Sequence, residues 1–129
     1  MGLKPANSKT YFFDTYAFIE AINGNKSYRP YMKGSTIITT MLNLMELHYI
    51  TLKNISERIA DAHYEFFKDL AIEISDDIIK KSNRFRYANK KKSFSYTDCI
   101  GYLIARARNI PFLTGDNAFK GMEGIEFVK

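Results

Sequence analysis

The sequence predicts an α/β fold in which helices cover both faces of a mainly parallel, five-stranded sheet. Two observations carry this prediction: short runs of β-branched and aromatic residues recur along the chain, and segments of helical periodicity alternate with them. Strands that alternate with helices form βαβ units, whose right-handed crossovers make the strands parallel. At 129 residues, the chain is expected to be a single domain over residues 1-129, with a flexible polar lead-in at 1-9.

The elements are expected in a regular order. Strands are expected at 11–13, 36–39, 71–74, 111–114 and 125–128. Helices are expected at 15–22, 40–52, 57–70, 76–88 and 95–107, and the stretch 26–34 is a loop or a short helix. On the second helix, one face is predicted to be apolar; it carries Met41, Leu42, Met45, Tyr49 and Leu52.

Composition and charge narrow the class of protein. The formal net charge is +5 and the isoelectric point about 9.3, which favours a polyanionic partner, although many enzymes are mildly basic for solubility. The single cysteine, Cys99, cannot form an internal disulfide, and this fits a cytoplasmic protein. No apolar run approaches the roughly 18 residues of a membrane span, so no membrane association is expected.

Four acidic residues are expected to meet at one edge of the sheet. Asp14 directly follows the first strand and Asp116 the fourth, which places both at the carboxyl edge. Asp98 begins the helix that leads into the fourth strand; a helix of about 11 residues and a strand of about 5 cover similar distances, so the chain returns to that edge. Glu46 lies in the first two turns of the second helix and borders its apolar face.

Each acid also has an ordinary structural interpretation. Asp98 could complete a capping box with Ser95, Asp14 could cap a helix, Asp116 could be a turn residue, and Glu46 could be a partly exposed helix residue. Four acids at one edge, however, repel one another unless protons or cations intervene. Carboxylates are ligands of Mg²⁺ and Mn²⁺, so the cluster predicts a bound divalent metal and a phosphate-bearing substrate.

A basic segment follows the middle of the chain and is the expected phosphate-contacting surface. Aromatic residues at 85, 87 and 94 interleave with it and could stack on unpaired bases. The alternatives are a solvated helix face and a surface that receives an acidic partner segment. The cations of this segment are Lys80, Lys81, Arg84, Arg86, Lys90, Lys91 and Lys92.

Other catalytic chemistries lack their motifs. His48 and His63 do not form an HExxH pattern, and no GxxxxGK[ST] loop is present, so zinc protease and P-loop chemistry are disfavoured. Both histidines are interpreted as structural or surface residues.

The ordered set of four acidic motifs resembles the PIN-domain nucleases, and among them the small VapC-type toxins. The matching segments are Phe12-Phe13-Asp14-Thr15-Tyr16-Ala17-Phe18, Leu44-Met45-Glu46-Leu47, Ser95-Tyr96-Thr97-Asp98-Cys99-Ile100 and Pro111-Phe112-Leu113-Thr114-Gly115-Asp116-Asn117-Ala118-Phe119. Any one of them is a weak signal, but together they span nearly the whole chain.

The resemblance implies a three-layer α/β/α sandwich and a metal-dependent ribonuclease. It implies that Asp14, Glu46, Asp98 and Asp116 are catalytic and hold one or two Mg²⁺ or Mn²⁺ ions. Polar residues beside them would orient water or a carboxylate, namely Thr15, Thr97, Thr114 and Asn117. The implied partners are an RNA substrate and a small antitoxin protein.

Other functions and a further partner stay open. The functional alternatives are a PIN-like subunit of an RNA-processing assembly, a catalytically silent RNA-binding module and a metal-dependent phosphatase for small substrates. A homodimer is a further possibility, because scattered aromatic residues leave room for an interface.

Overall fold

The computed structural model describes residues 9–129, and it contains a parallel sheet flanked by helices. The strand order is β2-β1-β3-β4, and every neighbouring pair is parallel. The predicted α/β class and parallel sheet are confirmed. The strands are β1 (Thr10–Phe13), β2 (Thr36–Ile38), β3 (Phe112–Thr114) and β4 (Ile125–Phe127).

The number of strands corrects the prediction, because the described chain has four strands rather than five. The predicted strand at 71–74 makes only an isolated bridge, between Ala71 and Thr39. Its neighbour β2 ends at Ile38, and Thr40 already caps the following helix, so no extended partner remains beyond Thr39. The lead-in predicted at 1-9 lies outside the described residues except for Lys9, whose carbonyl accepts a hydrogen bond of 2.8 Å from the Thr36 N–H.

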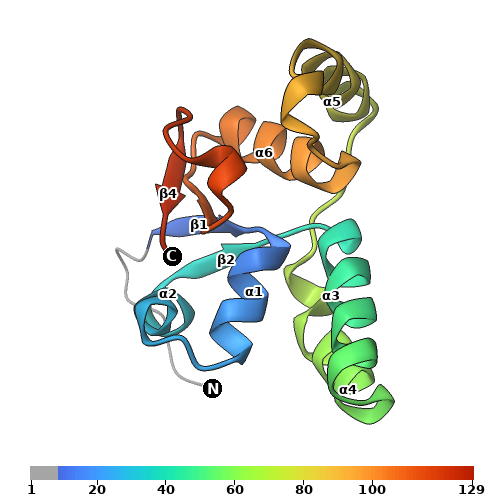
Figure 1. The fold of residues 1–129 in the computed structure, drawn as a ribbon, viewed down its shortest axis with the longest axis vertical. Helices are drawn as coiled ribbons and strands as arrows, with labels where there is room; N and C mark the ends of the chain where they lie inside the picture. Colours follow the sequence, from blue (N-terminus) through green and yellow to red (C-terminus); the bar gives the residue numbers. More distant parts are fainter. Residues whose placement is uncertain (1–8) are drawn as a thin grey trace.

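Helices cover both faces of the sheet, which gives the expected three layers (Figure 1). Side chains alternate along β1: Tyr11 and Phe13 enter one core, whereas Phe12 enters the other and stacks on Phe112. One layer contains α1 (Thr15–Ile22), α2 (Arg29–Gly34), α3 (Met41–Asn54) and α4 (Glu57–Phe67), and the other contains α5 (Asp76–Ala88) and α6 (Tyr96–Arg108). Short 3₁₀ turns lie at η1 (Lys26–Tyr28), η2 (Lys68–Leu70), η3 (Lys90–Lys92) and η4 (Asn117–Phe119).

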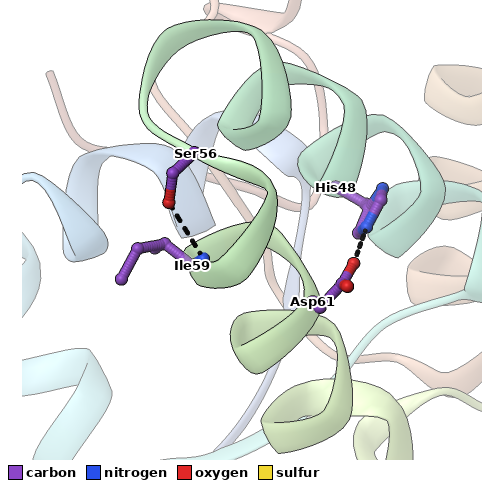
Figure 2. Close-up of polar contacts among 4 residues, drawn as sticks. All are labelled: His48, Ser56, Ile59 and Asp61. Carbon is purple, nitrogen blue, oxygen red and sulfur yellow. Dashed lines mark hydrogen bonds and ion pairs between the residues drawn. The ribbon is translucent and has the colours of Figure 1, made fainter.

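Helices α3 and α4 form a hairpin held by polar contacts. Figure 2 shows His48 of α3 facing Asp61 of α4, with 2.8 Å between Nε2 and Oδ1. At the start of α4, the Ile59 N–H donates to the Ser56 hydroxyl at 3.1 Å, which caps the helix (Figure 2). The His48–Asp61 contact joins α4 to α3, the helix that carries Glu46.

The buried side of α3 differs from the predicted apolar face. Its buried residues are Asn43, Leu44, Leu47 and Thr51. Met45 and Tyr49, in contrast, are 60% and 61% exposed. The side of α3 that packs on the core includes polar residues, and most of its predicted apolar face is exposed to solvent.

Candidate active site

All four predicted acids line one cleft. Asp14, Glu46, Asp98 and Asp116 contribute to a cavity of about 670 Å³, together with apolar and aromatic side chains. Asp14 lies between β1 and α1, Glu46 on α3, Asp98 on α6, and Asp116 directly before η4. Four segments far apart in sequence therefore meet at the carboxyl edge of the sheet.

Three of the acids cap helices and line the cleft at the same time. Asp14 Oδ1 accepts from the Ala17 N–H at 2.9 Å, and Asp116 Oδ1 accepts from the Ala118 N–H at 3.0 Å. Asp98 Oδ2 accepts from the Ser95 N–H at 3.0 Å, which completes the capping box. The structural and the functional interpretations of these acids are therefore compatible, because a cap fixes the orientation of the carboxylate.

Glu46 is positioned by a chain of hydrogen bonds that leads to two buried polar residues, Thr40 and Asn43. The Thr15 hydroxyl donates to Glu46 Oε1 at 2.7 Å, and the Asn43 side-chain amide donates to Thr15 Oγ1 at 3.2 Å. The Thr40 hydroxyl in turn donates to Asn43 Oδ1 at 2.6 Å. Because Thr40 and Asn43 are each only 1% exposed, the inner end of this relay is shielded from competing water.

Replacing Asn43 with Ala is expected to lower the free energy of unfolding by about 1–3 kcal/mol, because the buried Thr40 hydroxyl loses its acceptor. Glu46 should also lose its fixed orientation. Urea denaturation measures the change in the free energy of unfolding, and an assay of RNA cleavage reports the misorientation of Glu46. Asn54→Ala, at the exposed end of the same helix, is the control and should change neither.

Burial and mutual repulsion shape the titration of the acids. Burial raises the pKa of Asp14 from 3.8 to about 7; hydrogen bonds from Thr114 and Ala17 oppose this rise, and the charges of Asp98 and Asp116 add to it. Burial likewise raises the pKa of Asp98, against hydrogen bonds from Ser95 and with help from the charges of Glu46 and Asp116. The carboxylates therefore act on one another across the cleft.

The donor chemistry of the cleft suits a hard divalent cation. Carboxylate oxygens are the ligands that Mg²⁺ prefers. Burial is the main cause of the raised pKa of Asp14, and a cation would offset the smaller contribution from the charges of Asp98 and Asp116. Over residues 9–129, no three acidic, His or Cys side chains lie close enough together to enclose an ion directly. Mg²⁺ usually keeps several waters and takes one or two carboxylates, so spread acids fit such an ion.

The polar residues predicted beside the acids have different surroundings. Thr15 contacts Glu46, and Thr114 is fully buried and accepts from the Asp116 N–H at 3.0 Å. Thr97 is buried on α6, and Asn117 is exposed at the start of η4. The relay residues Thr40 and Asn43 were not predicted. Their signal was the spacing of three between 40, 43 and 46, which places polar groups along one side of a helix.

The predicted basic segment forms α5 and η3, and its cations are exposed. Among the aromatics expected to stack on bases, Phe94 is buried in the core and Phe85 packs on it with 5.8 Å between ring centroids. Tyr87 is 76% exposed and is the member of that set that is open to a ligand. Lys81 pairs with Asp77 at 3.1 Å.

The fold and the cleft together define an α/β/α domain with four acids at the carboxyl edge of its parallel sheet. The family model described as "PIN domain" matches residues 11–125, so the chain belongs to the PIN domain family. No curated protein matches the sequence.

Several solved structures have this fold at low sequence identity. The VapC20 toxin of Mycobacterium tuberculosis, described as cleaving the sarcin–ricin loop, superposes with a TM-score of 0.74 at 15% identity over 92% of this chain and 99% of its own. A toxin–antitoxin complex from Klebsiella pneumoniae gives 0.69 at 20% identity over 89% of this chain and 94% of that chain.

A third structure is VapBC2 from Rickettsia felis bound to a promoter DNA fragment. It gives a TM-score of 0.69 at 21% identity over 92% of this chain and 97% of that chain. The likeness to these structures is one of fold over nearly the whole chain. Among the described residues, no helix has the length and apolar character needed to cross a membrane.

Proposed function

We propose that this chain is a ribonuclease that hydrolyses RNA phosphodiester bonds with one or two Mg²⁺ or Mn²⁺ ions. The observation that carries the proposal is the convergence of four acids from four separate segments in one cleft of a chain with net charge +5. Membership of the PIN domain family supports it. The proposed metal-holding and catalytic residues are Asp14, Glu46, Asp98 and Asp116.

The chain's own contribution to the chemistry is to hold its carboxylates in place. A divalent ion at such a site lowers the pKa of a bound water and neutralises charge on the phosphate. Three carboxylates are held by helix caps and the fourth by the Thr15 hydroxyl, so little rearrangement is needed when RNA binds. The basic segment on α5 and η3 is proposed to attract the RNA backbone.

We further propose that the chain is the toxin of a toxin–antitoxin pair in the cytoplasm. The fold is shared with proteins described as toxins and toxin–antitoxin complexes, which supports the proposal. The acidic cleft and the basic segment are both proposed to be accessible to an antitoxin segment. Co-expression with the product of an adjacent small gene, followed by affinity purification and a cleavage assay, tests this: a genuine antitoxin should co-purify and suppress RNA cleavage.

Asp98→Asn is expected to reduce RNA cleavage in Mg²⁺ or Mn²⁺ by at least about 100-fold, because it removes one proposed metal ligand. The amide oxygen can still accept from the Ser95 N–H, so the helix cap should survive. Glu73→Gln, at an exposed acid outside the cleft, is the control and should cleave like the wild type. Equal activity of Asp98→Asn and the wild type would remove the metal-nuclease proposal.

Metal binding can be measured without any cleavage. Mn²⁺ should raise the midpoint of thermal unfolding of the wild type and of Glu73→Gln, because the ion binds only the folded site. The rise should be smaller in Asp98→Asn. A chain that binds RNA but shows neither cleavage nor a Mn²⁺ shift would instead be the silent RNA-binding module.

A further inference from the structure

A second hollow lies outside the acidic cleft, between the end of α5, the η3 turn and the start of α6. Its volume is about 340 Å³, near the lower end of the range for small-molecule sites. Cationic and aromatic side chains dominate its wall, among them Arg86, Tyr87, Lys90 and Tyr96. None of its lining residues belongs to the acidic cleft.

The cations of this hollow are held against aromatic rings. Arg86 Nε donates to the Phe94 carbonyl at 2.9 Å, and its guanidinium carbon lies 4.2 Å from the centre of the Tyr96 ring. Lys90 Nζ lies 5.1 Å from the centre of the Tyr87 ring. Positive charge and aromatic surface therefore lie side by side in the hollow, and these are the two features that bind single-stranded nucleic acid.

The two tyrosine rings of the hollow are exposed, although each has a cation against it. Tyr87 is 76% exposed and Tyr96 is 56% exposed, whereas Phe94 behind them is buried in the core. A base can stack on such a ring only when it is unpaired, because duplex bases are covered by their neighbours. The chemistry of the hollow therefore favours single-stranded RNA over a duplex.

Both walls of the hollow connect to the acids of the cleft. Tyr96 is the first residue of α6, and the capping box of Ser95 and Asp98 fixes that end of the helix. At the end of η3, Lys92 Nζ donates to the Ala118 carbonyl at 2.9 Å, and the Ala118 N–H donates to Asp116. The start of α6 therefore contributes Tyr96 to the hollow and Asp98 to the acidic cleft.

We propose that this hollow binds one unpaired nucleotide of the RNA strand that crosses the cleft, with its base against Tyr87 or Tyr96 and its phosphate at Arg86 and Lys90. The proposal rests on the proposed function, since it assumes an RNA substrate. It assigns the hollow to substrate positioning rather than to catalysis, so its loss should weaken RNA binding and leave the chemical step in place.

The test is binding of a short fluorescein-labelled oligouridylate to the full chain in EDTA, measured by fluorescence anisotropy. At least one of Tyr87→Ala and Tyr96→Ala should weaken binding by about 5- to 100-fold, the range for loss of one base–aromatic stack. Phe66→Ala is the matched control, because Phe66 on α4 is also 76% exposed and lies outside the hollow. It should bind like the wild type.

An abasic oligomer of the same length separates stacking from charge. It should bind the wild type and the tyrosine variants equally, whereas Lys90→Ala should weaken both oligomers. Unchanged affinity of both tyrosine variants for oligouridylate would overturn the proposal. So would an oligoglutamate peptide that binds the wild type and loses binding in the tyrosine variants, since the hollow would then receive an acidic protein segment.

Cleavage in Mn²⁺, measured in parallel, distinguishes failure of the hollow from failure of the nuclease. If the wild type cleaves RNA and both tyrosine variants keep its affinity and KM, the hollow proposal fails alone. If no variant cleaves RNA but binding still depends on Tyr87 and Tyr96, the nuclease proposal fails and the nucleotide site stands. A raised KM with unchanged kcat in Tyr87→Ala supports both.

Discussion

Replacing Asp14 with Asn is expected to stabilise the fold at pH 8 while abolishing RNA cleavage. Asp14 is 5% exposed, and burial raises the pKa of its carboxyl group to about 7. At pH 8 the folded protein therefore holds a buried charge that the unfolded chain would expose to water. Asparagine removes that charge and remains a favourable helix N-cap, so it can keep the hydrogen bond from the Ala17 N–H.

The pH dependence has a definite sign. The pKa of Asp14 is about 7 in the folded protein, whereas an unperturbed Asp, as in the unfolded chain, has a pKa of 3.8. Between these two pH values the folded state therefore binds more protons than the unfolded state. The free energy of unfolding of the wild type therefore falls as pH rises through this window, by on the order of 1 kcal/mol per pH unit. Below pH about 4 both states are protonated, and Asp14 contributes no pH dependence there.

Urea denaturation in EDTA at pH 5 and pH 8 tests this prediction. Asp14→Asn should be more stable than the wild type at pH 8, by on the order of a few kcal/mol, and the difference should shrink toward pH 4. Asp76→Asn is the control: this exposed acid in the first turn of α5 favours the helix dipole, so its loss should be slightly destabilising. If the free energy of unfolding of Asp14→Asn and of the wild type changed with pH in parallel, burial would not raise the pKa of Asp14 as described.

The meeting of Asp14, Asp98 and Asp116 was predictable because the direction of strands and helices determines where their ends lie. Asp14 and Asp116 follow β1 and β3 directly, and β1 pairs with β3 in parallel, so both acids had to reach the same edge. Asp98 was expected there because a helix of about 11 residues and a returning strand of about 5 would cover similar distances. For these three acids, the order and direction of neighbouring elements were enough to predict that they lie at one edge of the sheet.

The side of α3 that faces the core was not predictable in the same way. Helical periodicity marked the side with Met45 and Tyr49 as apolar, yet those residues are largely exposed and Tyr49 lines the cleft. The helix instead packs with Asn43 inward, because Thr15 and Thr40 lie there as hydrogen-bond partners. When a buried polar residue has its hydrogen-bond partners in other parts of the chain, the periodicity of apolar residues in its own helix does not reveal that it is buried.

The strand count failed for a related reason. Residues 71–74 have strand-like composition, but a strand needs a neighbour over several residues, and β2 ends where Thr40 caps α3. Likewise, the sequence could not show that Phe94 is buried while Tyr87 is exposed, since both lie within two residues of a lysine or an arginine. In each case the deciding contact is distant in sequence.

Gly115→Ala is expected to lower both stability and activity, because Gly115 stands directly before Asp116 at a point with no room for a side chain. A Cβ atom there would overlap the main-chain oxygen of Val128 and the ring of Tyr16. Val128 cannot easily retreat: its N–H donates to the Thr114 carbonyl at 2.9 Å, and its own carbonyl accepts from the Tyr28 hydroxyl. The strain should therefore fall on the link between β3 and Asp116.

Overpacking of this kind costs about 2–3 kcal/mol when backbone must move. The movement should also displace Asp116, whose N–H donates to the Thr114 hydroxyl at 3.0 Å, so cleavage should fall as well. Gly34→Ala is the matched control, because a Cβ at the end of α2 meets open space and should leave stability and cleavage near wild-type values. Urea denaturation and Mn²⁺-dependent cleavage test this prediction. If Gly115→Ala has the same free energy of unfolding and the same cleavage rate as Gly34→Ala, the close approach of β3 to the C-terminal segment does not position Asp116.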